Sequence, residues 1–113
     1  SNGKTFAFLI PLIIHVKSQS RIITSGSGPI ALILAPSREL AAQIRDDFCK
    51  ICFDDSVKLL LVTGGMPKYE QFKQIRDGGN HIIVATPGRL IDMIKMKACK
   101  SLFETSFAVI DEA

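Results

Sequence analysis

The feature that most constrains the fold is a regular alternation between short apolar runs and segments with helical spacing. Four short apolar runs, bounded by glycine, proline or polar residues, span residues 30–35, 57–63, 81–86 and 107–110. Such runs are typical of strands that are buried on both faces, as in parallel sheets. Helical spacing of apolar residues is found before and between these runs, at 5–17, 37–53, 68–76 and 88–97. Because strand and helix alternate roughly every 25 residues, the pattern predicts an α/β fold built on an open parallel sheet with right-handed crossovers.

The helical segments carry more specific expectations. Ser37 is placed to cap the second helix, and Pro11 is expected to kink or break the first one. Tyr69, Phe72 and Ile75 form a stripe that is more typical of a core face than of a base-stacking platform. Structural roles in or near the core are expected for Cys52, His15, His81, Met93 and Met96.

Composition excludes several classes of protein. With 47% hydrophobic and 22% charged residues, the chain has an ordinary globular composition and is not expected to be disordered. The net charge of +3 is compatible with a polyanionic partner without requiring one. The apolar stretch 6–16 is too short to cross a bilayer, which takes about 20 apolar residues, so we expect no membrane partner.

The three cysteines carry a prediction about the compartment and exclude one kind of metal site. An odd number of cysteines does not form a disulfide framework, which favours a reducing, intracellular compartment. Cys49 and Cys52 have the spacing of a metal motif, but they lie inside an amphipathic helix and no second pair follows. We therefore do not interpret them as a metal site.

Residues with useful chemistry gather where a parallel sheet binds its ligands. In open parallel sheets, ligands bind beyond the carboxyl ends of the strands. The segments that follow the four predicted strands are 36–39, 63–66, 86–89 and 111–113, and residues 1–5 precede the first helix. We therefore expect a single ligand-binding edge formed by these five segments.

Gly3-Lys4-Thr5, at the start of the first helix, has the composition of a phosphate-binding loop. Glycine lets main-chain amides approach a phosphate, lysine reaches the phosphate oxygens, and a threonine hydroxyl can bind magnesium. The helix N-terminus adds partial positive charge. Taken alone, the tripeptide is equally well explained by chance.

Asp111 and Glu112 follow the last apolar run and supply the complementary chemistry. In phosphoryl-transfer sites an aspartate at the tip of a strand holds magnesium, and a neighbouring glutamate can activate the attacking water. The alternative for this pair alone is a solvated acidic turn. Its combination with Gly3-Lys4-Thr5, across alternating strands and helices, favours a P-loop nucleoside triphosphatase.

Five sequence boxes in a fixed order link the chain to a known family. The boxes are Lys4–Pro11, Pro36–Ala41 (Pro-Ser-Arg-Glu-Leu-Ala), Gly64-Gly65, Thr86–Arg89 (Thr-Pro-Gly-Arg) and Val109–Ala113 (Val-Ile-Asp-Glu-Ala). With these boxes the chain resembles a DEAD-box ATP-dependent RNA helicase, in the first of its two RecA-like domains. The resemblance implies a three-layer P-loop fold on a RecA-like open parallel sheet that is incomplete in this chain. It also implies that residues 1–113 are part of the helicase ATP-binding domain and that the second RecA-like domain is absent.

The resemblance also implies site residues, cofactors and a partner. The cofactors would be ATP and Mg²⁺, with Lys4 and Glu112 as catalytic residues. ATP phosphates would be bound by Gly3, Lys4 and Thr5, and the metal by Thr5 and Asp111. The partner would be RNA, contacted through its backbone with little sequence preference. The residues implied in RNA binding are Pro36, Ser37, Arg38, Gly64, Gly65, Thr86, Gly88 and Arg89.

Departures from the family pattern keep other hypotheses open. The residues before Gly3 are usually glycine and then serine or threonine, whereas this chain has Ser1 and Asn2. The strand that would feed the phosphate loop is expected beside residues 107–110. We expect the 113 residues alone to be inactive. The alternatives are another P-loop class (a DNA helicase, kinase or GTPase) and a catalytically inactive RNA-binding scaffold.

Two further segments suggest a cellular process. Residues 65–71 and 89–97 are similar to family members linked to pre-mRNA splicing. This similarity implies ribonucleoprotein or spliceosomal partners, and it favours the nucleus over the cytoplasm.

Overall fold

A computed structural model describes residues 3–19, 28–53, 55–98 and 106–109, the last of these as backbone only. The described residues form four helices and four strands that alternate along the chain. Every predicted strand and helix is present, in the predicted order and with boundaries shifted by no more than a few residues. The elements are α1 (Gly3–Ser18), β1 (Ala31–Leu34), α2 (Arg38–Ile51), β2 (Leu59–Val62), α3 (Lys68–Asp77), β3 (Ile82–Ala85), α4 (Pro87–Lys95) and β4 (Ser106–Val109).

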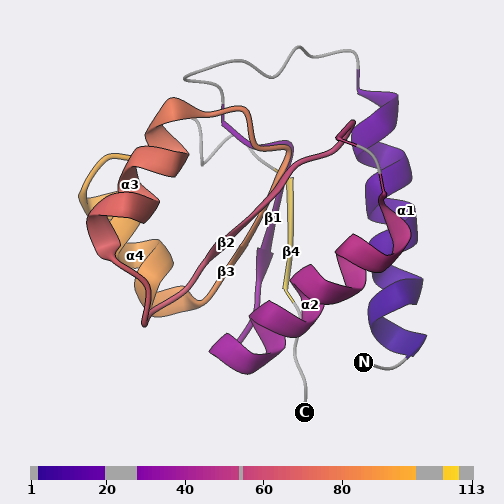
Figure 1. The fold of residues 1–113 in the computed structure, drawn as a ribbon, viewed down its shortest axis with the longest axis horizontal. Helices are drawn as coiled ribbons and strands as arrows, with labels where there is room; N and C mark the ends of the chain where they lie inside the picture. The colour runs from indigo at the N-terminus through magenta and orange to yellow at the C-terminus, as the bar shows by residue number, and fades with distance from the viewer. Residues whose placement is uncertain (1–2, 20–27, 54, 99–105, 110–113) are drawn as a thin grey trace.

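The strands form one parallel sheet with helices on both faces. The strand order among the described residues is β2-β3-β1-β4, and every pairing is parallel. In the register of the sheet, Leu32 of β1 lies opposite Ile83 of β3 and Phe107 of β4. Helices α1 and α2 cover one face and α3 and α4 the other (Figure 1). The predicted three-layer α/β architecture with an open parallel sheet is confirmed.

Alternate residues of each central strand enter two separate cores. In β3, Ile82 and Val84 pack in the cluster beneath α1 and α2, whereas Ile83 and Ala85 pack in the cluster beneath α3 and α4. All four side chains are almost completely excluded from solvent. Since successive side chains of a strand point to opposite faces, a strand covered on both faces must be apolar at every position. This is the physical origin of the continuous apolar runs in the sequence.

Helix α2 begins and packs as predicted. The Ser37 hydroxyl accepts a hydrogen bond from the backbone N–H of Leu40 at 3.1 Å, which caps the first turn. Its buried stripe enters the first core, and half-buried Cys52 at the C-cap packs against the same cluster. The buried apolar residues of this stripe are Leu40, Ala41, Ile44 and Phe48.

Helix α1 continues through Pro11 without a break, so of the kink or break expected there, the break does not occur. Ala7, whose carbonyl loses its bond to the proline nitrogen, is exposed like Pro11 itself, so water can satisfy that carbonyl.

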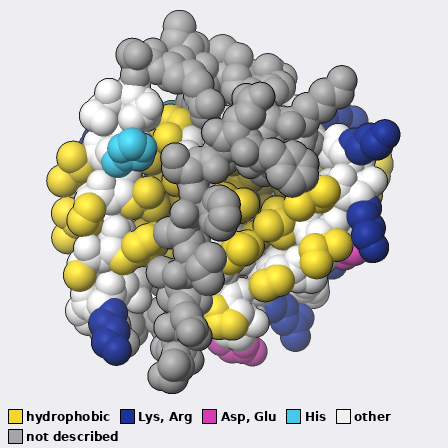
Figure 2. Space-filling view, turned by 180° about the vertical axis from the view of Figure 1, so that it is seen from behind, with side chains coloured by type: hydrophobic (Ala, Val, Ile, Leu, Met, Phe, Trp, Pro, Cys, Tyr) yellow, Lys and Arg dark blue, Asp and Glu magenta, His cyan; other side chains and the backbone are white. Residues whose placement is uncertain are grey.

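Helix α1 is only half buried, because Ile10 and Ile14 are 47% and 63% exposed. Hydrophobic side chains accordingly lie along the α1 edge of the molecule (Figure 2). In the described part of the chain, no helix combines the length and the apolar character needed to span a membrane.

The predicted core stripe of α3 is wrong for one of its three residues. Ile75 is buried and Phe72 half buried against the second core, but Tyr69 is 58% exposed. Tyr69 stacks on Phe72, with ring centroids 5.8 Å apart. The inward position one turn before Ile75 belongs to Gln71, which is fully buried. The second core is filled by Met93, with half-buried Met96 packed against it, as expected for gap-filling methionines.

His81 has the predicted structural role at the start of β3, whereas the same expectation for His15 is wrong, because His15 is exposed. Its ring atom Nδ1 accepts a hydrogen bond from the backbone N–H of Lys58 at 3.0 Å, which joins the segments leading into β2 and β3. Burial, and to a smaller extent the positive charge of Lys58, lowers the pKa of His81 below its usual value of 6.5. Nδ1 can accept this bond only when the ring is neutral.

We expect acid to destabilise the fold through His81. The pKa of His81 is lower in the folded chain than in the unfolded chain, so the unfolded chain binds the proton more readily. The contribution of His81 to the free energy of unfolding is therefore fully present above about pH 6.5 and is lost as the pH falls below that value. The temperature at the midpoint of thermal unfolding should decrease when the pH is lowered from about 7.5 to about 5.5. This acid-induced loss of thermal stability should be smaller in His81→Asn, whose amide oxygen can still accept the hydrogen bond. It should remain unchanged in the control His15→Asn, which replaces an exposed histidine. An unchanged decline in His81→Asn would contradict this account.

Candidate functional site

The predicted site residues lie along one edge of the sheet. The carboxyl ends of all four strands and the N-terminal ends of all four described helices lie together, at the lower edge in Figure 1. Segment 36–38 leaves β1 there, segment 63–66 leaves β2, and segment 86–89 leaves β3. Helix α1 begins at the same edge with Gly3. The segments that were predicted to share one edge of the sheet therefore do so, as far as the described residues reach.

Gly3, Lys4 and Thr5 are the first three residues of α1. Lys4 is exposed and Thr5 half buried. The first turn of a helix has backbone N–H groups without helical acceptors and carries partial positive charge. A lysine and a hydroxyl oxygen at this position fit a nucleotide phosphate and a hard cation such as Mg²⁺. The predicted partners Asp111 and Glu112 lie outside the described residues, and their roles stay predictions.

Residues 63–66, here called the glycine turn, are contacted by Arg38 from α2. Arg38 is the exposed first residue of α2, and its Nη1 donates to the carbonyl of Gly64 at 3.5 Å. Gly65 has a φ of +87°, in the region that favours glycine. A Cβ atom on Gly65 would overlap the Arg38 guanidinium. The backbone conformation at position 65 thus requires glycine, whereas the exposed Arg38 side chain could move away from a Cβ atom.

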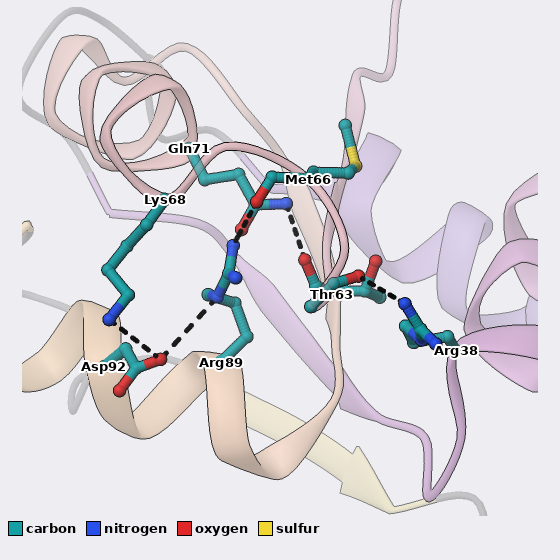
Figure 3. Close-up of polar contacts among 8 residues, drawn as sticks. Arg38, Thr63, Met66, Lys68, Gln71, Arg89 and Asp92 are labelled. Carbon is teal, nitrogen blue, oxygen red and sulfur yellow. Dashed lines mark hydrogen bonds and ion pairs between the residues drawn. The ribbon is translucent and has the colours of Figure 1, made fainter.

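Arg89 contacts the glycine turn from α4. Its Nη1 donates to the carbonyl of Met66 at 2.8 Å and to Oε1 of Gln71 at 2.7 Å. Its Nε lies 3.6 Å from a carboxylate oxygen of Asp92. Only 12% of the Arg89 side chain is exposed, and its Nη1 and Nε atoms face protein acceptors (Figure 3).

Gln71 is a site residue that the sequence analysis missed. Its side chain is fully buried, and its Nε2 donates to the carbonyl of Thr63 at 3.0 Å while its Oε1 accepts from Arg89. One signal was available: Gln71 is a polar residue one helical turn from buried Ile75, on the face that the helix must bury. A polar residue on such a face needs hydrogen-bond partners inside the protein.

The remaining predicted RNA-binding residues lie at the same edge in different roles. Thr86 is the N-cap of α4, and its backbone N–H donates to the carbonyl of Val62 at 3.1 Å. Pro36 and Gly88 are exposed, and a Cβ atom on Gly88 would meet nothing within 4 Å. The Ser37 hydroxyl is used as a helix cap. Three segments distant in sequence therefore converge, with the glycine turn between Arg38 and Arg89 (Figure 3).

The described residues contain no group of three or more histidine, cysteine or acidic side chains able to hold a metal ion. Cys49 on α2 is exposed and Cys52 at the C-cap of α2 is half buried, with neither engaged in a disulfide.

Comparison with known proteins gives relatives over almost the whole chain. The chain is 46% identical to DEAD-box ATP-dependent RNA helicase 24 of Arabidopsis thaliana, over 99% of this chain and 14% of the relative. It is 48% identical to the probable ATP-dependent RNA helicase ddx42 of Dictyostelium discoideum, over 99% of this chain and 11% of the relative. The chain thus spans a small part of the length of these curated relatives.

Solved structures and family models agree with these relatives. The crystal structure of the yeast DEAD-box splicing factor Prp28 matches with a TM-score of 0.70 and 35% identity, over 86% of this chain and 23% of that one. The model of the DEAD/DEAH box helicase family matches residues 1–113. The chain therefore belongs to the DEAD/DEAH box helicase family.

Proposed function

We propose that this chain provides the ATP-binding loop and part of the RNA-binding surface of an ATP-dependent RNA helicase. One observation carries the proposal: the glycine turn is held between Arg38 and Arg89 at the same sheet edge where Gly3-Lys4-Thr5 begins α1. Nucleotide and nucleic acid would then be bound along one edge, where hydrolysis and RNA binding can be coupled. The names of the curated relatives, which are ATP-dependent RNA helicases, support the same function.

At the nucleotide end, the chain's own residues have separate tasks. The first turn of α1 and Lys4 would bind the phosphates, and the Thr5 hydroxyl and Asp111 would hold Mg²⁺. When bound, the metal neutralises negative charge on the phosphates. Glu112 would orient and deprotonate the attacking water. The exposure of Lys4 and the placement of Thr5 in the first helical turn support this assignment.

At the RNA end, the segments after β1, β2 and β3 would follow the sugar-phosphate backbone. Arg38 is the exposed cation of this surface and is suited to a direct phosphate contact. The Nη1 and Nε atoms of Arg89 face protein acceptors, which favours a role for these atoms in holding the glycine turn in place. Backbone contacts carry no base information, so we expect little sequence preference, and the 2′-hydroxyl would distinguish RNA from DNA.

Two similarities support a proposal for the cellular setting. The yeast structural neighbour is a splicing factor by its title, and residues 65–71 and 89–97 resemble splicing-linked members of the family. We propose an intracellular protein of the nucleus that works with ribonucleoprotein partners.

ATP turnover by the full-length protein tests the proposal and separates it from its alternatives. We expect turnover to rise when single-stranded RNA is added and to rise much less with DNA of the same sequence. Equal stimulation by DNA would favour a DNA helicase. RNA binding without any ATP turnover would favour a catalytically inactive scaffold.

A further inference from the structure

We propose that Gln71 is a positioning residue for RNA binding, which sets the glycine turn and Arg89 in their working arrangement. The inference rests on the proposed function of the same surface. Gln71 itself is fully buried and cannot contact RNA. It acts through two groups that it holds, the carbonyl of Thr63 and the guanidinium of Arg89.

The amide of Gln71 is suited to both of its partners. Its Nε2 donates to the Thr63 carbonyl at 3.0 Å, and its Oε1 accepts from Arg89 at 2.7 Å (Figure 3). A carboxylate at this position could accept from Arg89 but could not donate to Thr63, and an apolar side chain could do neither. Only a side chain with a donor and an acceptor at its tip joins the end of β2 to the start of α4.

The consequence for RNA lies in the carbonyl groups of the glycine turn. Three of its four carbonyls accept hydrogen bonds from side chains: Thr63 from Gln71, Gly64 from Arg38 and Met66 from Arg89. Carbonyl oxygens carry partial negative charge and would repel an approaching phosphate. Each donor that occupies a carbonyl reduces this repulsion, and Gln71 supports two of the three bonds because it also orients Arg89.

Ion pairs around Arg89 make its orientation depend on Gln71. A carboxylate oxygen of Asp92 lies 3.6 Å from Nε of Arg89 and 3.6 Å from the ammonium of Lys68. The shared carboxylate is 38% exposed and therefore a weak anchor. The short bond to buried Gln71 is the stronger constraint, because a charged donor meets a neutral acceptor away from water.

A double-mutant cycle in the full-length protein tests the inference. The dissociation constant of a single-stranded RNA would be measured for the wild type, Gln71→Met, Arg89→Met and the double variant. We expect Gln71→Met to weaken binding about tenfold, and the double variant to lose less binding free energy than the two single variants added together, because Gln71 acts partly through Arg89 and partly through the Thr63 carbonyl. The matched control is Gln74→Met, at an exposed glutamine of the same helix, which should bind like the wild type.

Each outcome of the cycle has a defined meaning. Unchanged RNA affinity in Gln71→Met, or a loss that adds fully to that of Arg89→Met, would overturn the inference, since a purely structural role would lower thermal stability without this coupling. If Gln71→Met does not fold, Gln71→Glu decides: wild-type affinity in that variant would overturn the inference. A wild type that binds no RNA would instead contradict the proposed function, and the inference would fall with it.

Discussion

Lys4→Ala is expected to lower the rate of RNA-stimulated ATP hydrolysis in the full-length protein by about 100-fold or more. Lys4 is exposed in the first turn of α1, where a phosphate would meet unpaired helical N–H groups and a full positive charge together. Removing the ammonium leaves the backbone donors but takes away the charge that reaches the phosphate oxygens.

The control for Lys4→Ala is a lysine on the same helix. Lys17→Ala removes an equal charge from an exposed position in the last turn of α1, far from the ligand-binding edge, and should leave the hydrolysis rate unchanged. Steady-state turnover at saturating RNA is the measurement. Equal rates in the two variants would show that the N-terminus of α1 does not bind the nucleotide.

Gly65→Ala is expected to lower the free energy of unfolding by about 1–3 kcal/mol and to weaken RNA binding. The φ of +87° is unfavourable for alanine, and the new Cβ atom would displace the Arg38 guanidinium from the Gly64 carbonyl. The matched control is Gly64→Ala, where a Cβ atom meets nothing within 4 Å. That control should change stability by about 0.5 kcal/mol or less.

The two costs of Gly65→Ala can be separated by a second substitution. Adding Arg38→Ala removes the side chain that the new methyl group overlaps; because that exposed side chain can move at little cost, the double variant should stay close in stability to Gly65→Ala, which leaves backbone strain as the main cost. Denaturant unfolding measures both effects. A Gly65→Ala variant as stable as Gly64→Ala would contradict the conformation of the glycine turn.

Much of the fold could be predicted because local pattern and tertiary structure agree in this chain. Strands that are buried on both faces must be apolar throughout, and Ile82–Ala85 shows this in the sequence. Ser37 caps α2 through a bond to a residue three positions away, which is a local interaction. Of the kink or break expected at Pro11, the break does not occur, because the cost of a helical proline depends on whether the freed carbonyl reaches water, which is a property of the folded chain.

The site was predictable in its location but not in its internal bonds. The order of strands and helices places segments 36–38, 63–66 and 86–89 at one edge in any parallel sheet of this kind. Whether Arg89 faces solvent or bonds to Met66 depends on the packing of α4 against α3, which links residues 23 positions apart. Tyr69 and Gln71 both fit a helical stripe in sequence, and only the orientation of α3 on the sheet decides which of them is buried.

The most direct measurement is the ATP turnover of the full-length wild type compared with that of Glu112→Gln, each with and without single-stranded RNA. The variant keeps the size of the side chain and removes the base that would activate water. We predict that RNA stimulates turnover in the wild type and that Glu112→Gln loses this stimulated turnover. Wild-type turnover that is indistinguishable from Glu112→Gln in the presence of RNA would contradict the proposal that this chain belongs to an active ATP-dependent RNA helicase.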